Sequence, residues 1–84
     1  MKNKNIKIPM HLGPYLKEIR KENNFTQIEL SKESSILQKT ISAIEKGNTK
    51  CTLETLFKFL RACGYHMELV PNNNINNEND EVEW

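Results

Sequence analysis

The segment QKTISAIEKG, residues 38–47, constrains the fold of this chain more than any other stretch. Read as a helix at about 100° per residue, it places Ile41 and Ile44 on one face, which Leu37 just upstream extends. The opposite face of an ordinary surface helix carries long charged side chains. Here that face is made of short, amide or lysine side chains, namely Gln38, Lys39, Ser42, Ala43 and Lys46. The pattern therefore predicts a short helix whose outer face contacts another molecule.

End signals predict the first two helices. Gly13 as N-cap and Pro14 at the first helical position favour a helix that begins there. Thr26 and Glu29 form a capping box, in which the side chain of each residue accepts a hydrogen bond from the backbone amide of the other. They predict a second helix over residues 27–33.

Glycines end the third and fourth predicted helices. The third helix, over residues 38–46, follows a turn at residues 34–35 and ends at Gly47, because glycine readily adopts the backbone conformation that ends a helix. Thr52 predicts the N-cap of a fourth helix over residues 53–63. The predicted buried positions of the four helices are Leu12, Leu16, Ile19, Leu30, Leu53, Leu56, Phe57 and Leu60.

The hydrophobic period changes from helical to alternating after the fourth helix. Residues 65–70, YHMELV, predict a strand with Tyr65, Met67 and Leu69 on one face and His66, Glu68 and Val70 on the other. A lone strand leaves its backbone polar groups unpaired, so it needs a partner. That partner is residues 6–8, IKI, or the same segment of a second copy. We favour the second copy, because the core of an 84-residue chain is small and gains from dimerisation.

Charge is distributed unevenly along the chain. Residues 72–84 hold four acidic and no basic residues, so residues 1–71 hold all 12 basic and seven of the 11 acidic residues. We predict a flexible basic arm over residues 1–10, a folded domain over residues 11–71 and a disordered acidic tail over residues 72–84. The basic body favours a polyanionic partner. The lysines of the arm are Lys2, Lys4 and Lys7. The sequence leaves two interpretations of the arm open: it lies along the polyanionic partner, or it is a disordered N-terminal segment.

Two short helices joined by a tight turn, the second with a small polar outer face, describe a helix-turn-helix. The second helix of such a pair enters the DNA major groove, where bulky or acidic side chains would obstruct it. Gln38 can bond to adenine, Lys39 to guanine and Ser42 to either, while Ala43 can meet a thymine methyl group. Thr40 flanks these residues. We therefore predict that the outer face of the third helix reads base edges.

The stretch FTQIELSKESSILQKTISAIEKG resembles the Cro/cI-type (XRE) helix-turn-helix family, over about residues 12–64. The positions that carry the resemblance are Thr26-Gln27, Glu29-Leu30, Thr40-Ile41-Ser42 and Ile44-Glu45. The resemblance implies an all-α, lambda-repressor-like domain of four to five helices, with the short C-terminal strand pairing across a dimer.

The resemblance also implies roles for further residues. Gln27 is similar to a glutamine that contacts a DNA phosphate at the start of the second helix. Arg20 and Glu45 stand where the family often forms an ion pair between the first and third helices. A loop that holds a second run of phosphates is matched by Lys46, Asn48 and Lys50. Three positions depart from the family pattern: Ser34 replaces an apolar residue, Ser35 a turn glycine and Leu37 a polar helix cap.

The segment CTLETLFKFLRACGYHMELV, with a tail ending in Glu83-Trp84, looks most like HipB-type antitoxins. That resemblance implies an antitoxin and autorepressor whose partners are double-stranded operator DNA, a second copy of itself and a HipA-like Ser/Thr kinase toxin, with a further small subunit left open. The alternatives are a stand-alone or phage-type transcriptional repressor, and a protein-interaction module that neutralises a kinase directly. Trp84 predicts a tail anchor that docks on a partner protein or marks the chain for proteolysis.

The sequence shows no constellation for catalysis or metal binding. There is no nucleophile–base pair and no Gly-rich phosphate loop, so we expect no enzyme activity. Cys51, Cys63 and His66 match no common zinc spacing, and Cys63 is expected in the core, so we expect no metal and no cofactor. Two cysteines are too few for a disulfide framework, and no apolar run approaches the roughly 20 residues of a membrane span. We therefore expect a cytoplasmic, nucleoid-associated bacterial protein.

Overall fold

The computed structural model describes residues 4–48 and 50–72 of the chain. A 3-10 turn, η1 (Pro9–His11), leads directly into α1 (Leu12–Glu22). Three further helices follow, namely α2 (Gln27–Ser34), α3 (Gln38–Glu45) and α4 (Leu53–Ala62). Over the ranges that the structure describes there is no strand, and the predicted all-α class is confirmed.

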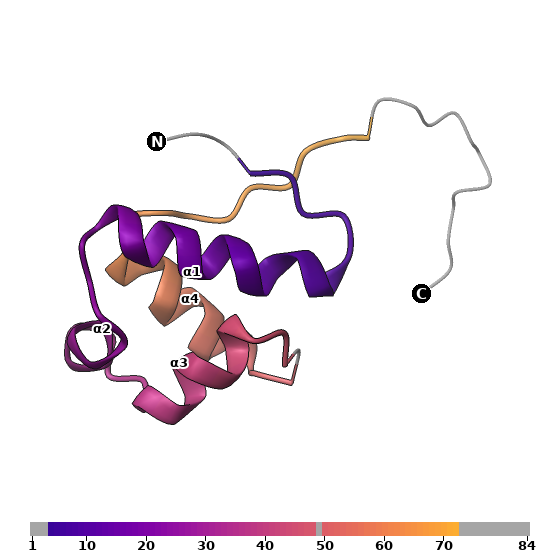
Figure 1. The fold of residues 1–84 in the computed structure, drawn as a ribbon. Coiled ribbons are helices and arrows are strands. Elements are labelled where there is room, and N and C mark those ends of the chain that lie inside the picture. The colour runs from indigo at the N-terminus through magenta and orange to yellow at the C-terminus, as the bar shows by residue number, and fades with distance from the viewer. Residues whose placement is uncertain (1–3, 49, 73–84) are drawn as a thin grey trace.

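The helices pack around one small apolar core. α1 lies along one side of the domain, with α2, α3 and α4 on the other side of the core (Figure 1). α3 contacts both α1 and α2, and α2 also contacts α4. The side chains that solvent does not reach are those of Leu16, Leu30, Ile41, Phe59 and Cys63. Because Ile41 and Ile44 anchor α3 to this core, its opposite face is left at the surface of the domain.

The predicted capping box at the start of α2 is confirmed. Thr26 Oγ1 accepts a hydrogen bond from the Glu29 amide at 3.0 Å, and Glu29 Oε1 accepts one from the Thr26 amide at 2.9 Å. Thr52 caps α4 by accepting a hydrogen bond from the Thr55 amide. Gly47 directly follows the last turn of α3 with φ of +106°, as predicted for a residue that ends a helix.

The prediction of Gly13 as a helix cap is wrong. α1 begins two residues earlier, with His11 as its N-cap, and Gly13 lies buried inside the helix. A β-carbon at Gly13 would lie 2.7 Å from the carbonyl oxygen of Ile44 and 2.9 Å from that of Glu45. Gly13 is therefore explained by the close approach of α1 to the end of α3.

The predicted apolar stripe of α4 is only partly correct. Leu56 is buried as expected, but Phe57 is 47% exposed and Leu53 is 72% exposed. Phe59 is buried in their place. The helix carries two adjacent apolar rows, and the contact with α2 buries the row that contains Leu56, Phe59 and Cys63. The sequence of α4 does not distinguish which of two apolar rows faces the core.

The turn between α2 and α3 accommodates the three departures from the family pattern. Ser34 is buried, and its hydroxyl donates to the carbonyl oxygen of Leu30 at 2.7 Å and accepts from the Ile36 amide at 3.2 Å. Ser35 has φ of +65°, a left-handed conformation that favours glycine. Leu37 is the N-cap of α3, is 66% exposed and makes no side-chain capping bond.

Two extended segments, residues 4–8 and 65–72, run over the face of α1 that points away from α3 (Figure 1). Lys4 forms ion pairs with Glu18 at 3.3 Å and Glu22 at 3.5 Å, and the Tyr65 hydroxyl donates to Glu22 at 2.8 Å. Residues 65–70 form no strand in the single chain, so their pairing with a second copy stays a prediction. Lys2 of the predicted arm and residues 73–84 of the predicted tail, with Trp84, lie outside the described residues.

Candidate nucleic-acid interface

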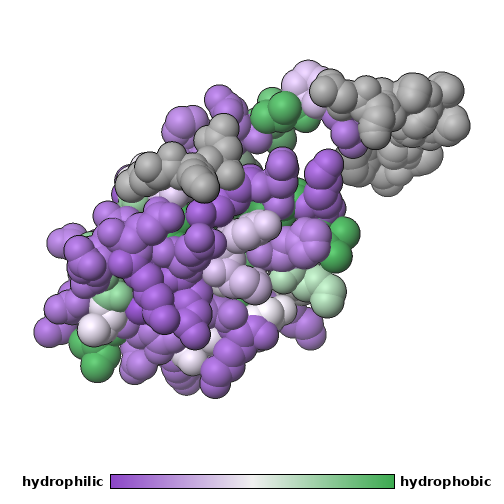
Figure 2. Space-filling model, turned by 45° about the horizontal axis from the view of Figure 1, so that its top comes forward, coloured by the Kyte–Doolittle hydropathy of each residue, from purple (hydrophilic) through white to green (hydrophobic). Residues whose placement is uncertain are grey.

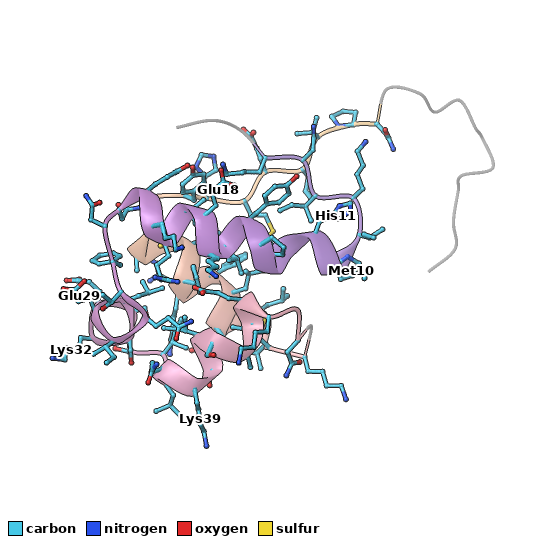
Figure 3. All side chains as sticks on the ribbon, in the orientation of Figure 1. Met10, His11, Glu18, Glu29, Lys32 and Lys39 are labelled. Carbon is cyan, nitrogen blue, oxygen red and sulfur yellow. The ribbon has the colours of Figure 1, made fainter. Side chains whose placement is uncertain are left out.

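The outer face of α3 presents the side chains that the sequence assigned to base reading. Gln38 and Lys39 are exposed, while Thr40, Ser42 and Ala43 are half-buried beside them. Figure 3 shows Lys39 projecting from α3 away from the rest of the domain. The one acidic residue of α3, Glu45, is buried on the inner side. This face is therefore small, polar and free of exposed carboxylates, as entry into a major groove requires.

The loop after α3 holds a second group of exposed polar side chains. Lys46, Asn48 and Lys50 are all exposed. The Asn48 amide donates to the carbonyl oxygen of Ala43 at 3.0 Å, which fixes the loop to the end of α3. The side-chain oxygen of Asn48 in turn accepts a hydrogen bond from the Lys50 amide at 2.9 Å. These bonds hold the loop close to the outer face of α3, called the reading face below. Its two lysines are cations that can contact phosphates there.

Gln27 joins the start of α2 to the start of α3. Its side-chain nitrogen, Nε2, donates to Glu45 Oε1 at 3.1 Å. Its oxygen, Oε1, accepts a hydrogen bond from Gln38 Nε2 at 3.2 Å. The sequence assigned Gln27 to a phosphate and Gln38 to a base as separate roles. The contact between them was missed, because a spacing of 11 residues across a turn gives no local signal.

Arg20 of α1 and Glu45 of α3 form a buried, two-pronged ion pair. Arg20 Nε lies 2.6 Å from Glu45 Oε2, and Arg20 Nη2 donates to Glu45 Oε1 at 2.9 Å. A third guanidinium nitrogen, Nη1, donates to the carbonyl oxygen of Phe25 at 2.7 Å. The hydrogen bond to Glu45 raises the pKa of Arg20 despite the opposing effect of burial. The pair ties α3 to α1 directly beneath the reading face.

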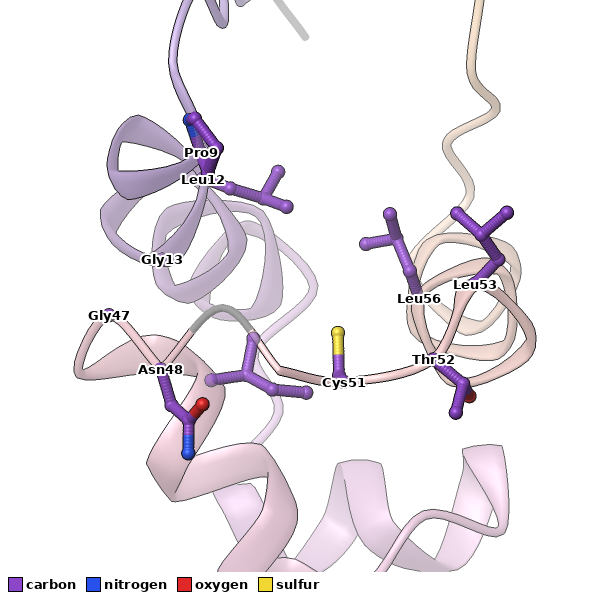
Figure 4. A pocket seen from close by; sticks show the side chains of 10 residues that line it. Pro9, Leu12, Gly13, Gly47, Asn48, Cys51, Thr52, Leu53 and Leu56 are labelled. Carbon is purple, nitrogen blue, oxygen red and sulfur yellow. The ribbon is translucent and has the colours of Figure 1, made fainter. Parts of the chain in front are cut away.

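A small cleft of about 170 Å³ lies between the start of α1, the loop after α3 and the start of α4. In Figure 4 the side chains of Leu12 and Leu56 extend toward it from opposite sides, with the Cys51 sulfur between them. The cleft has no charged lining residue. Cys63 lies elsewhere, in the core, where burial raises its pKa to about 11. The described part of the chain contains no group of three or more His, Cys, Asp or Glu residues that could hold a metal ion.

Away from this face the described surface also carries exposed apolar side chains, among them Leu53, Phe57 and Leu69. Viewed from nearer the two extended segments, the molecule is mainly hydrophilic, and its hydrophobic residues lie apart from one another (Figure 2). None of the helices in the described ranges is long and apolar enough to cross a bilayer. The outer face of α3 and the loop that follows it are the candidate nucleic-acid interface of the domain.

The chain is similar to known proteins along most of its length. The HTH_3 family model, described as helix-turn-helix, matches residues 16–70. Antitoxin HipB of Escherichia coli strain K12 is 37% identical over 79 residues, which span 90% of each chain. Antitoxin HipB of Escherichia coli O6:H1 is 34% identical over 79 residues, which span 90% of this chain and 84% of that protein.

Two solved structures have a similar fold. A HipB–O1–O2 complex matches with a TM-score of 0.75 at 36% identity, over 82% of this chain and all of the HipB chain. A HipA–HipB–O2–O3 complex matches with a TM-score of 0.74 at 36% identity, over 82% of this chain and 97% of the matched chain.

Proposed function

This chain belongs to the HTH_3 helix-turn-helix family, and from that premise we propose that it is a DNA-binding antitoxin that represses its own operon with a HipA-like toxin. The observation that carries the proposal is the 37% identity to Antitoxin HipB over 90% of both chains. The fold similarity to HipB within a HipA–HipB–O2–O3 complex supports a kinase partner and a DNA partner together.

The exposure of these side chains and the family resemblance support the following residue roles. Gln38, Lys39 and Ser42 read base edges in the major groove, with Thr40 and Ala43 completing the contact. Phosphate contacts position the module without reading sequence, and they come from Gln27, Lys46, Asn48 and Lys50. The Arg20–Glu45 ion pair holds the reading helix against α1.

The protein acts on DNA as a homodimer. Residues 65–70 supply the pairing strand: Met67, Leu69 and Val70 are exposed apolar side chains in an extended segment. The backbone amides of Met67, Leu69 and Val70 donate no hydrogen bond to another described backbone group, whereas the Tyr65 amide donates to the carbonyl oxygen of Leu60. Such an unpaired segment suits addition to a second, identical strand. Two symmetric reading helices would then recognise half-sites about 34 Å apart.

A proline substitution tests the pairing strand. Met67→Pro removes one amide proton that no described contact of the single chain uses, so it should leave α1 to α4 folded. We expect it to convert the dimer to a monomer in sedimentation experiments. Asn72→Pro, beyond the predicted strand, is the matched control and should remain dimeric. Because alternate amides of a strand face its partner, a dimer that survives both Met67→Pro and the neighbouring Glu68→Pro would refute strand pairing.

A titration into DNA tests the repressor function. The full chain is added to a labelled duplex from upstream of its own gene and to a scrambled duplex, at physiological salt. We expect its own duplex to bind about 10³-fold more tightly or better, with one dimer per pair of half-sites. Equal and steeply salt-dependent binding to both duplexes would show that only phosphate contacts are made and would contradict the proposal.

The antitoxin function needs the kinase. The proposal predicts a gene for a HipA-like kinase beside that of the chain. Co-expression with that kinase should restore growth, and the two proteins should copurify. If the kinase still inhibits growth while the chain is stably expressed, the antitoxin function is contradicted.

The acidic tail contributes through Trp84, as a docking anchor or a proteolysis signal. Deleting residues 72–84 should weaken toxin binding or lengthen the half-life of the chain in cells. We assign no catalysis to the chain, and we place it in the cytoplasm on operator DNA.

A further inference from the structure

Glu22, at the end of α1, joins the two extended segments of the chain. Its Oε2 atom lies 3.5 Å from Lys4 Nζ, in the segment before α1, and its Oε1 atom accepts a hydrogen bond from the Tyr65 hydroxyl at 2.8 Å. We infer that Lys4 and Glu22 hold Tyr65 in place and so direct residues 65–70 toward pairing with a second copy of the chain. Lys4 and Glu22 are then positioning residues of the dimer. The inference rests on the proposed function, because it concerns the same pairing strand.

Tyr65 is the point at which the pairing segment leaves the packed domain. Its amide donates to the carbonyl oxygen of Leu60 at 2.9 Å, and its half-buried side chain packs against the core. Beyond it, residues 66–70 are exposed and make no backbone hydrogen bond to another described backbone group. The direction in which this exposed segment extends from the domain is therefore set at Tyr65.

Lys4 determines where the carboxylate of Glu22 lies. The Lys4 side chain is only 12% exposed, and its Nζ atom lies 3.3 Å from Glu18 Oε2 as well as 3.5 Å from Glu22 Oε2. Glu18 and Glu22 are one helical turn apart on α1, so their like charges repel each other unless a cation pairs with both. Lys4 offsets this repulsion through one oxygen of Glu22, and the other oxygen accepts the proton of Tyr65.

The ionisation states of these groups agree with this arrangement. The hydrogen bond from Tyr65 lowers the pKa of Glu22, and attraction to Lys4 acts in the same direction. The same hydrogen bond raises the pKa of Tyr65, so at neutral pH the phenol keeps the proton that it donates. Holding the start of the pairing segment in one position reduces the conformational entropy that pairing would cost. The cluster of Lys4, Glu18, Glu22 and Tyr65 therefore strengthens dimerisation without contacting the second copy.

The position of the cluster also separates Lys4 from the DNA contacts. The two extended segments run over the face of α1 that points away from α3 (Figure 1). Lys4 is held on that face by two carboxylates, on the side of the domain opposite to DNA bound at the reading face. Lys46 is instead exposed at the end of α3. Lys4 therefore serves the dimer, and Lys46 serves the phosphate contacts.

Dissociation constants of the dimer test the inference, measured by fluorescence-detected sedimentation of the full chain with one label. Lys4→Met removes the ammonium group but keeps a long unbranched side chain, and Tyr65→Phe removes only the hydroxyl. Each should raise the dissociation constant about fivefold while the helix content stays that of wild type. The double variant should match Tyr65→Phe alone, because Lys4 acts on the segment only through Glu22 and the Tyr65 hydroxyl. Lys7→Met, on the same segment and exposed, is the matched control and should dimerise as wild type does.

The salt dependence of DNA binding gives a second readout. At concentrations where every variant is dimeric, Lys4→Met should keep the slope of wild type, whereas Lys46→Ala should lower it by about 1. Three results would each overturn the inference: Lys4→Met dimerises as tightly as wild type, the two single losses multiply in the double variant, or the slope of Lys4→Met falls by about 1, which would assign Lys4 to a phosphate.

The proline variants separate this inference from the proposed function. If Met67→Pro or Glu68→Pro gives a monomer but Lys4→Met dimerises as wild type does, strand pairing stands and only the role of Lys4 is refuted. If both proline variants remain dimeric, the proposed strand pairing fails and the inference fails with it.

Discussion

The strongest test of the fold concerns the Arg20–Glu45 ion pair. Both residues are at least nine-tenths buried, and their side chains meet at 2.6 and 2.9 Å. Removing one partner leaves the other as an unpaired buried charge, which costs about 3–5 kcal/mol. The free energy of unfolding of a natural domain is only about 5–15 kcal/mol. Arg20→Met or Glu45→Leu alone should therefore bring the chain close to unfolding.

The double variant separates the pair from simple loss of packing. In Arg20→Met/Glu45→Leu no charge is left buried. The cost then reduces to the lost hydrogen bonds to Phe25 and Gln27, and should be about 1–3 kcal/mol in total. The double variant should therefore be more stable than either single variant. The pKa of Arg20 is raised by its partner, so its contribution to stability is fully present below the pKa of the unfolded chain and persists through neutral pH.

Urea unfolding followed by circular dichroism, at one fixed protein concentration, measures these differences. Lys39→Met on the exposed face of α3 is the control, and it should change the free energy of unfolding by no more than about 0.5 kcal/mol. The reasoning is refuted if either single variant lowers the free energy of unfolding by less than about 1 kcal/mol, which is the loss expected for an exposed ion pair. It is equally refuted if the cost of the double variant equals the sum of the two single costs.

Three further perturbations follow from the packing. Gly13→Ala should lower the free energy of unfolding by about 1–3 kcal/mol, although alanine favours helices, because its β-carbon meets two backbone oxygens of α3 at 2.7 and 2.9 Å. A rise in the melting temperature would disprove the close approach. Leu37→Ser should stabilise the domain by about 1 kcal/mol by supplying the missing cap of α3, and unchanged thermal unfolding would count against that reading. Burial raises the pKa of Cys63 to about 11, so its contribution to stability is complete below the pKa of the unfolded thiol and is lost as pH rises toward 11. Urea midpoints of wild type and Cys63→Ala across this range should show the extra slope only in wild type.

Most of the local structure could be read from the sequence, because its causes are local. The capping box of Thr26 and Glu29 and the cap at Thr52 each join residues three positions apart. Any chain with these residues meets the same hydrogen-bonding requirement at a helix start. For the same reason the bounds of α2 and α3 lie within a residue of the prediction.

The reading face was also predictable in its composition. A helical period assigned Gln38, Lys39 and Ser42 to one face, and the buried positions of Ile41 and Ile44 on the opposite side agree with that assignment. The period of a helix fixes which side chains share a face whatever the face contacts. It says nothing about how their polar groups are oriented.

The sequence by itself thus determined the helices, the caps of α2 and α4 and the residues on the outer face of α3. The tertiary structure alone decided three things: that Gly13 is needed where α1 meets α3, that α4 buries Phe59 rather than Phe57, and that Gln27 links Gln38 to Glu45. The physical reason is range. Caps and faces depend on neighbours within one or two turns, whereas these three features depend on how separate helices approach one another in the packed domain.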